Sequence, residues 1–152
     1  MFERKITTKI KKFTEEFFRI ASFDVKVEVD EIEEFTIKVS VKMDEPQVLI
    51  GENGKTLIYV QHILNKVLKK KLDKELFIDL DINDYKAKKI NYLKELAKSY
   101  ADDVALSGQS KEFRPMSSYE RRIIHLELKD RSDVVTESSG QEPDRKIIVR
   151  PA

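Results

Sequence analysis

The sequence predicts an α+β protein made of two small domains, residues 1–82 and residues 83–152. Segments with apolar residues at helical spacing alternate with short segments in which every second residue is apolar. This pattern indicates helices mixed with half-buried strands. Both halves of the chain contain predicted helices and strands of their own. A length of 152 residues is compatible with two small domains, each with its own core.

Composition and charge restrict the possible functions. Charged residues make up 38% of the chain but the formal net charge is only +1, so any nucleic-acid contact has to depend on local geometry. The chain has no cysteine and two histidines, and we expect no disulfide, no metal site and no cofactor. No apolar run approaches the roughly 18 residues of a membrane span, and the N-terminus shows no signal peptide. We therefore expect a cytoplasmic protein.

The first predicted helix covers residues 3–21 and is basic. Its apolar residues recur at spacings of four and three and so share one face: Ile6, Ile10, Phe13, Phe17 and Ile20. We expect this face to pack on the sheet that follows. A basic amphipathic helix can also lie on a membrane surface, and that placement remains an alternative.

Two strands, each with one buried face, follow the first helix. Alternating apolar residues mark them: Val25, Val27 and Val29 in the first, and Phe35, Ile37, Val39 and Val41 in the second. Residues 30–34 lie between the two strands and suit an exposed hairpin connection. Asp44-Glu45-Pro46 then begins a short helix, in which proline is tolerated in the first turn.

A longer helix begins at Gly54 and runs to Leu72. The residues expected to point inward are Leu57, Val60, Leu64, Val67 and Leu68. The residues expected to face solvent are Tyr59, His62, Lys66 and Lys69. A short strand over residues 77–82 completes the first half. Its predicted order is helix, strand, strand, short helix, glycine loop, helix, strand.

The second half is predicted to be another small α+β unit. Asn83-Asp84 offers an N-cap for a long helix that stops near Gly108. Ser117 and Glu120 form a capping box, which predicts a helix over residues 118–129. Two strands follow, at 134–137 and 146–149, and they are joined through Ser138-Ser139-Gly140.

The stretch Leu49–Leu57 carries the clearest chemical signal. Gly51 and Gly54 stand three residues apart, so the backbone can turn tightly and approach a ligand closely. The helix that follows directs free N–H groups and the positive end of its dipole at the loop, which favours an anion. Gly54-Lys55-Thr56 also resembles the end of a P-loop, but Leu49 occupies the position of that motif's first glycine. A plain turn between two helices remains an alternative.

A G-x-x-G loop in this element order resembles the type II K-homology (KH) domain, whose loop clamps about four backbone nucleotides of a single strand. The neighbouring residues make the family resemblance more specific. Gly54-Lys55-Thr56-Leu57, together with Val60-Gln61 and Leu64-Asn65, is similar to the KH domain of the Jag family.

The second half carries a further pair of candidate residues, Arg121 and His125. Positions i and i+4 share a helix face, and a guanidinium beside an imidazole suits phosphate. Pro115-Met116 and residues 119–125 resemble the signature of the R-3-H domain, which is named for this Arg and His. The later blocks of that signature are matched by residues 136–140, Glu142-Pro143, Arg145 and Arg150-Pro151.

The resemblance to the Jag family covers residues 23–151 and implies a bacterial single-stranded RNA-binding protein without enzymatic activity. It implies a post-transcriptional regulator linked to cell elongation, division or sporulation. The resemblance also implies a small KH-only protein as a partner, and a second copy of the chain is a further candidate partner. The expected RNA-contacting residues are Ile50, Gly51, Glu52, Asn53, Gly54 and Lys55 in the loop, and Arg121, Arg122 and His125 in the second half.

The sequence departs from the family in two respects. The loop interior is Glu52-Asn53, where relatives often carry basic residues, and we do not find the additional N-terminal domain that many relatives carry. Glu52 and the near-neutral net charge keep other functions open. The alternatives are a protein-interaction module that assembles with another KH protein, and a single-stranded DNA binder.

Overall fold

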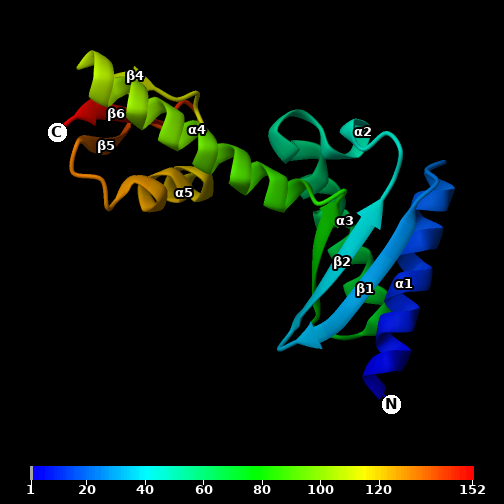
Figure 1. The fold of residues 1–152 in the computed structure, drawn as a ribbon. Coiled ribbons are helices and arrows are strands. Elements are labelled where there is room, and N and C mark those ends of the chain that lie inside the picture. Colours follow the sequence, from blue (N-terminus) through cyan, green and yellow to red (C-terminus); the bar gives the residue numbers. More distant parts are fainter. Residues whose placement is uncertain (1) are drawn as a thin grey trace. The chain divides into compact units, whose positions relative to one another are not determined.

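The computed structural model describes residues 2–152 and confirms the α+β class (Figure 1). The chain divides into two compact units, Met1–Lys86 and Ala87–Ala152. The first unit contains α1 (Phe2–Ile20), β1 (Lys26–Glu33), β2 (Thr36–Lys42), α2 (Gln47–Ile50), the 3₁₀ turn η1 (Glu52–Gly54), α3 (Lys55–Leu72) and β3 (Phe77–Ile82). Then follow α4 (Tyr85–Ser107), β4 (Lys111–Glu112), α5 (Ser118–Leu128), β5 (Val134–Ser139) and β6 (Lys146–Pro151).

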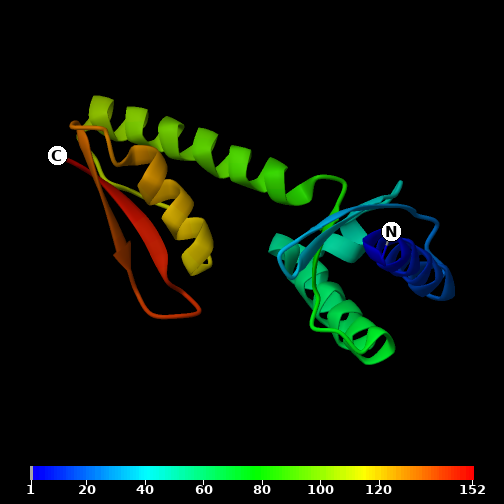
Figure 2. The same cartoon turned by 90° about the horizontal axis from the view of Figure 1, so that it is seen from below.

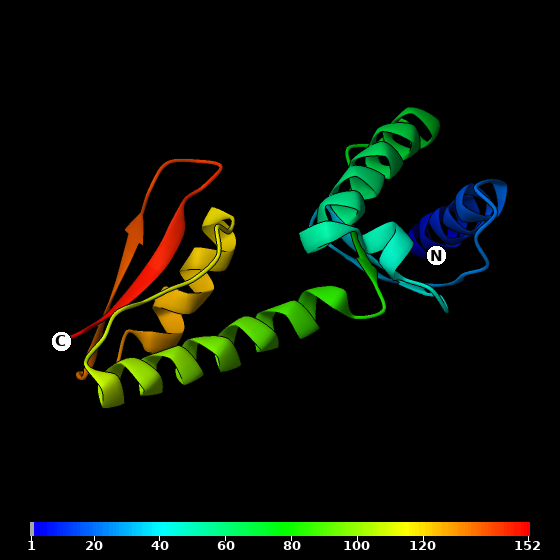
Figure 3. The same cartoon turned by 90° about the horizontal axis from the view of Figure 1, so that it is seen from above.

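The sheet of the first unit has the order β1-β2-β3, with β2 antiparallel to β1 and parallel to β3. Alternation along the strands gives the sheet one apolar face, because successive side chains point to opposite sides. The central strand contributes Ile37, Val39 and Val41, all fully buried. α1 and α3 both cover this face (Figures 2 and 3), and their buried side chains complete the core.

Helix α1 buries most of the predicted face: Ile6 and Ile10 are buried, and Phe13 and Phe17 are partly buried and pack against the core. The buried residues recur every four positions: Ile6, Ile10, Thr14 and Phe18. Ile20 was expected in this face but is 70% exposed. Thr14 is tolerated in the core because its hydroxyl donates to the carbonyl oxygen of Ile10 at 2.8 Å. The apolar face of α1 is occupied by the protein's own core, which removes the basis for the membrane-surface alternative. None of the helices in the described part of the chain is long and apolar enough to span a membrane.

The hairpin between β1 and β2 is tighter than predicted. Residues 30–33 belong to β1, and only Glu34 and Phe35 form the turn. Glu34 has a positive φ of 56°, which a short hairpin turn requires. Phe35 was therefore wrongly predicted as a buried strand residue, and it is 72% exposed at the turn.

Side chains from α3 cover the open edge of β3. The amide of Asn65 accepts from the Ile78 N–H at 2.6 Å and donates to the Ile78 carbonyl oxygen at 2.9 Å. The Gln61 side chain accepts from the Leu80 N–H at 2.9 Å. An unpaired strand edge is a template for unwanted strand pairing. These two side chains satisfy three backbone groups of the edge from within the unit.

We expect Asn65→Ala to lower the free energy of unfolding by about 1–3 kcal/mol, because it leaves two backbone groups of Ile78 without their partner. Lys66→Ala is the matched control, since it removes an exposed side chain from the next position of the same helix. Urea unfolding of both variants followed by circular dichroism measures the difference. Equal stability of the two variants would show that the edge of β3 does not depend on Asn65.

The second unit has a sheet of order β4-β6-β5, antiparallel throughout. Its core is formed by α4, α5 and the sheet: Leu93, Ala97, Ala101, Val104, Phe113, Ile124, Leu128, Val134, Ile147 and Val149. The long helix and the two later strands were predicted from their periodicity. The strand β4 was not predicted, because two residues are too few to show an alternating pattern.

The capping predictions had different outcomes. The capping box is present: the Glu120 N–H donates to Ser117 Oγ at 3.3 Å, and the Ser117 N–H donates to Glu120 Oε2 at 2.9 Å. The Asn83 side chain instead holds Met43, accepting from its N–H at 2.9 Å and donating to its carbonyl oxygen at 2.8 Å. Asp81 accepts from the Lys86 N–H in the first turn of α4, at 3.2 Å.

Candidate nucleic-acid interface

The glycine loop has a backbone that non-glycine residues rarely adopt. Gly51 has φ 70° and ψ −177°, a region that is essentially restricted to glycine. Asn53 is left-handed at φ 53° and ψ 26°, and Gly54 follows at φ 77° and ψ 12°. These φ and ψ angles turn the chain from α2 through η1 into α3 within a few residues.

Steric contacts explain why both glycines are needed. A Cβ atom on Gly51 would lie 2.1 Å from Thr56 Oγ1, and one on Gly54 would lie 2.8 Å from the ring of Tyr85. Both distances are shorter than real Cβ atoms tolerate. The fold itself therefore requires these glycines, whether or not a ligand is present.

The loop presents an uncapped helix N-terminus. Gly54 is the N-cap of α3, and no described side chain hydrogen-bonds to the N–H groups of its first turn. Glu52, Asn53 and Lys55 are exposed, whereas Ile50 is buried in the core of the unit. Because Ile50 is buried, it can support the loop from the core but is not exposed for contact with a ligand. The N–H groups at this end of α3 favour an anion.

The whole of α3 is cationic. Its 18 residues include five lysines and no acidic residue, although the chain carries almost equal numbers of both charges. One side of the helix carries Lys55, Tyr59, His62, Lys66 and Lys69, which follow one another at spacings of four and three. The absence of acidic residues is visible in the sequence, and it extends the candidate surface beyond the glycine loop.

In the second unit, Arg121 is mostly buried. Its Nη1 donates to the Met116 carbonyl oxygen at 2.6 Å, and its Nη2 lies 2.8 Å from Glu142 Oε1. Only 9% of its side chain is exposed, while 60% of the Glu142 side chain is exposed. The guanidinium therefore already joins the start of α5 to the loop between β5 and β6.

His125 lies on the same side of α5 as Arg121 and is partly buried. Its Nδ1 is 2.7 Å from Thr136 Oγ1 on β5. Burial lowers the pKa of His125 below its ordinary value, and the positive charge of Arg121 lowers that pKa further. The imidazole is therefore mainly neutral at pH 7. Arg122 is exposed and occupies another side of α5, because adjacent helix positions do not face one another.

The remaining residues of the R-3-H signature hold the β5–β6 hairpin in place. Arg145 Nε donates to Ser138 Oγ at 2.9 Å, and the Met116 N–H donates to the Arg145 carbonyl oxygen at 3.1 Å. Thr136 contacts His125, and Glu142 contacts Arg121, as described above. The sequence shows these residue types, but their partners become visible only when α5 and the hairpin are brought together.

Comparisons with known proteins agree with this arrangement. Residues 91–151 match the model of the R-3-H domain. The RNA-binding protein KhpB of Clostridium symbiosum is 36% identical over 126 residues, which is 83% of this chain and 56% of that protein. Only 26 of the 152 residues (152 − 126) remain outside that alignment, so it includes both the glycine loop and the Arg121–His125 segment.

This chain belongs to the Jag family.

Two further Jag-family relatives show the same relationship at lower identity. KhpB of Lactiplantibacillus plantarum is 33% identical over 67% of this chain and 32% of that protein, and KhpB of Bacillus subtilis is 27% identical over 75% of this chain and 56% of that protein. This Jag-family chain therefore spans about half, or less, of the length of the relatives it matches.

Proposed function

We propose that this chain binds single-stranded RNA and performs no chemistry on it. Residues 1–82 act as a KH domain and residues 83–152 act as an R-3-H domain. The main support is the glycine loop, which presents the uncapped N-terminus of a helix that has five lysines and no acidic residue. A G-x-x-G loop in a KH domain clamps about four backbone nucleotides. The relatives are named as RNA-binding proteins, which supports the same conclusion.

The proposed contacts have distinct roles. In the loop, the backbone around Gly51 and Gly54 approaches phosphate, Lys55 adds charge, Glu52 and Asn53 flank the strand, and Ile50 supports the loop from the core. In the second unit, the exposed Arg122 and the partly buried His125 contact the strand. Arg121 contributes mainly by its charge and by holding Glu142.

The proposed setting is the bacterial cytoplasm. There the protein acts as a post-transcriptional regulator linked to cell elongation, division or sporulation, with a small KH-only protein as a partner. These assignments rest on membership of the Jag family, and crosslinking in cells followed by sequencing of the bound RNA tests them.

A specific observation favours assembly as a second candidate function. Three exposed side chains follow one another at a spacing of four on α3 and so share one face, namely Tyr59 at 66%, Ile63 at 49% and Val67 at 36%. Exposed apolar residues that gather on one surface are typical of protein–protein contacts. Light scattering with and without RNA distinguishes assembly from RNA binding, and a matched DNA oligonucleotide tests the single-stranded DNA alternative.

We expect Glu52→Lys to bind single-stranded RNA about tenfold more tightly at low salt, because attraction replaces repulsion beside the phosphate. The gain should shrink as salt screens the contact, since the Debye length is about 8 Å at physiological ionic strength. Glu52→Gln should give about half of the gain in binding free energy. Fluorescence anisotropy with a labelled RNA over a series of salt concentrations measures the effect.

Glu28→Lys is the matched control, because it changes the net charge equally at an exposed position of β1. If both lysine variants tighten binding equally, the effect is one of overall charge and the loop is not the site. Unchanged affinity of Glu52→Lys at low salt would place the phosphate elsewhere and favour the assembly function.

A further inference from the structure

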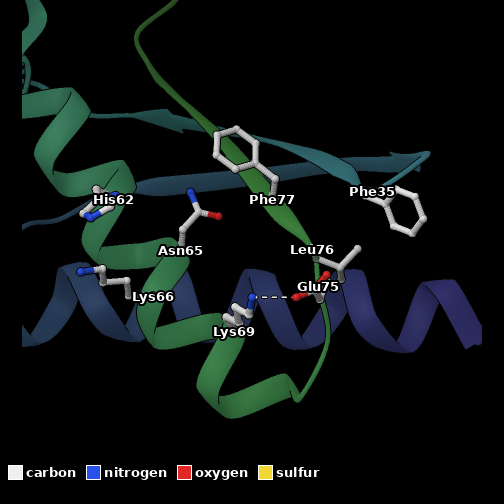
Figure 4. A pocket seen from close by; sticks show the side chains of 8 residues that line it. All are labelled: Phe35, His62, Asn65, Lys66, Lys69, Glu75, Leu76 and Phe77. Atoms are coloured by element: carbon white, nitrogen blue, oxygen red, sulfur yellow. Dashed lines mark hydrogen bonds and ion pairs between the residues drawn. The ribbon is translucent and has the colours of Figure 1, made fainter.

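A shallow groove of about 370 Å³ lies between α3 and the beginning of β3 (Figure 4). Phe77 and Phe35 line it on the strand side, and His62, Lys66 and Lys69 line it on the helix side. In the view of Figure 4 the ring of Phe77 lies between the α3 side chains and Phe35. None of these aromatic residues belongs to the glycine loop or to the R-3-H signature.

The two phenylalanines are unusually exposed for their size. Phe35 is 72% exposed and Phe77 is 50% exposed. They are neighbours, because the Phe77 N–H donates to the Phe35 carbonyl oxygen at 2.7 Å. Phe77 points away from the core because Ile78, the next residue in the strand, points into it. The hairpin turn and the strand start thus present two aromatic faces to solvent.

The charge around the groove favours an anionic occupant. His62, Lys66 and Lys69 come from the acid-free helix α3. Among the described residues that line the groove, the acidic one is Glu75, and it pairs with Lys69 at 2.9 Å, so Lys66 supplies the net positive charge of the lining lysines and Glu75. The groove and the proposed phosphate site lie on the same helix, with Lys66 about 16 Å along α3 from Lys55 at 1.5 Å per residue.

Hydrogen-bonded reading of bases at this edge of the sheet is limited. Asn65 occupies the N–H and carbonyl groups of Ile78, and Gln61 occupies the N–H of Leu80. What remains available in the groove is an aromatic surface with cations beside it. Aromatic faces bind single strands by stacking with the bases, and this mode tolerates any base.

We propose that Phe77 and Phe35 form a base-stacking site for single-stranded RNA, with His62 and Lys66 contacting the phosphates beside it. The site extends the strand held at the glycine loop along α3 and binds it without base preference. This inference rests on the proposed RNA-binding function.

Phe77→Ala in the full chain should weaken binding of an RNA of about ten uridines by about tenfold, as expected for losing one stacked base. Phe77→Leu keeps an apolar side chain but cannot stack, and it should weaken binding similarly. Ile20→Ala is the matched control, because Ile20 is likewise exposed and lies outside the groove. Circular dichroism confirms that each variant is folded. Equal affinity of Phe77→Ala, Phe77→Leu and wild type would overturn the stacking site.

A second measurement detects stacking directly. The chain contains no tryptophan, so Phe77→Trp introduces a single reporter that keeps an aromatic face. Its fluorescence should be quenched by the uridine RNA but not by an abasic RNA of the same length, which has the phosphates without the bases. Quenching by both, or by neither while the RNA is bound, contradicts stacking.

The outcomes separate this proposal from the function on which it rests. If the Phe77 variants bind RNA normally while Glu52→Lys still tightens binding, stacking is wrong and RNA binding stands. If wild type and Glu52→Lys both fail to bind the uridine RNA and the abasic RNA, both proposals fail. If Phe77→Ala changes the molar mass in light scattering but not the RNA affinity, the groove is a protein interface and the stacking site is overturned.

Discussion

Gly51→Ala is expected to lower the free energy of unfolding of the first unit by about 2–4 kcal/mol. Part of this comes from the backbone, since a non-glycine residue in this region of φ and ψ carries about 1–3 kcal/mol of strain. The rest comes from the collision of the new Cβ with Thr56, whose hydroxyl oxygen would be 2.1 Å away. Relief requires the start of α3 to move, so the loop should lose its shape as well as its stability.

Gly108→Ala is the matched control for this prediction. Gly108 also has a positive φ, 68°, but a Cβ there would meet no atom within 4 Å. It should therefore lose only the left-handed backbone penalty, about 1–2 kcal/mol. Urea unfolding with hydrogen exchange resolved by residue measures each unit separately. Equal losses at the two glycines would mean that Thr56 can move aside easily.

The geometry of Gly51 also changes how the loop should be tested. From the sequence alone, a variant with Asp at both Gly51 and Gly54 is a test of phosphate binding. The contacts of both glycines show that it would distort the loop first. Glu52→Lys is the sharper test, because Glu52 is exposed and its backbone conformation accepts any side chain.

Arg121→Ala is expected to lower the free energy of unfolding of the second unit by about 2–3 kcal/mol. The change leaves the Met116 carbonyl oxygen without its donor and removes the ion pair with Glu142. It also removes the buried aliphatic part of the side chain. Arg121→Lys should recover only part of the lost stability. The lysine ammonium cannot reproduce the planar guanidinium, whose two terminal nitrogens contact Met116 and Glu142 separately.

Arg122→Ala is the matched control, since it removes the same side chain from the adjacent, exposed position and should change stability by no more than about 0.5 kcal/mol. Chemical unfolding monitored in the second unit measures both variants. If Arg122 contacts RNA as proposed, its variant should weaken binding while remaining fully stable. Similar stability of the two variants would show that Arg121 does not hold the β5–β6 hairpin.

Most helices and strands were predictable because their periodicity is strong. The alternating residues of β2 and the capping box before α5 each specify a local structure that the fold retains. The errors fall where local rules compete. Ile20 fits the apolar periodicity of α1. The fully buried residues of this helix recur every four positions up to Phe18, however, so Ile20 lies outside the buried face. Phe35 fits the period of β2, but the two-residue turn places it outside the strand.

For the candidate sites, the residue types and the helix face that they share could be read from the sequence alone. It identified the glycine loop, because two glycines before a helix have a local meaning. It also paired Arg121 with His125, because a spacing of four has one geometry on a helix. The acid-free composition of α3 was equally available from the sequence.

Which of these groups can contact a ligand depends on contacts that form when the chain folds. Arg121 and Arg122 are equivalent in sequence, yet Glu142 and Met116 engage the first while the second is left exposed. Asn65 closes the edge of β3, and the hairpin turn brings Phe35 beside Phe77. The physical reason is that periodicity specifies the direction of a side chain, whereas its partner comes from a distant segment that only folding brings into contact.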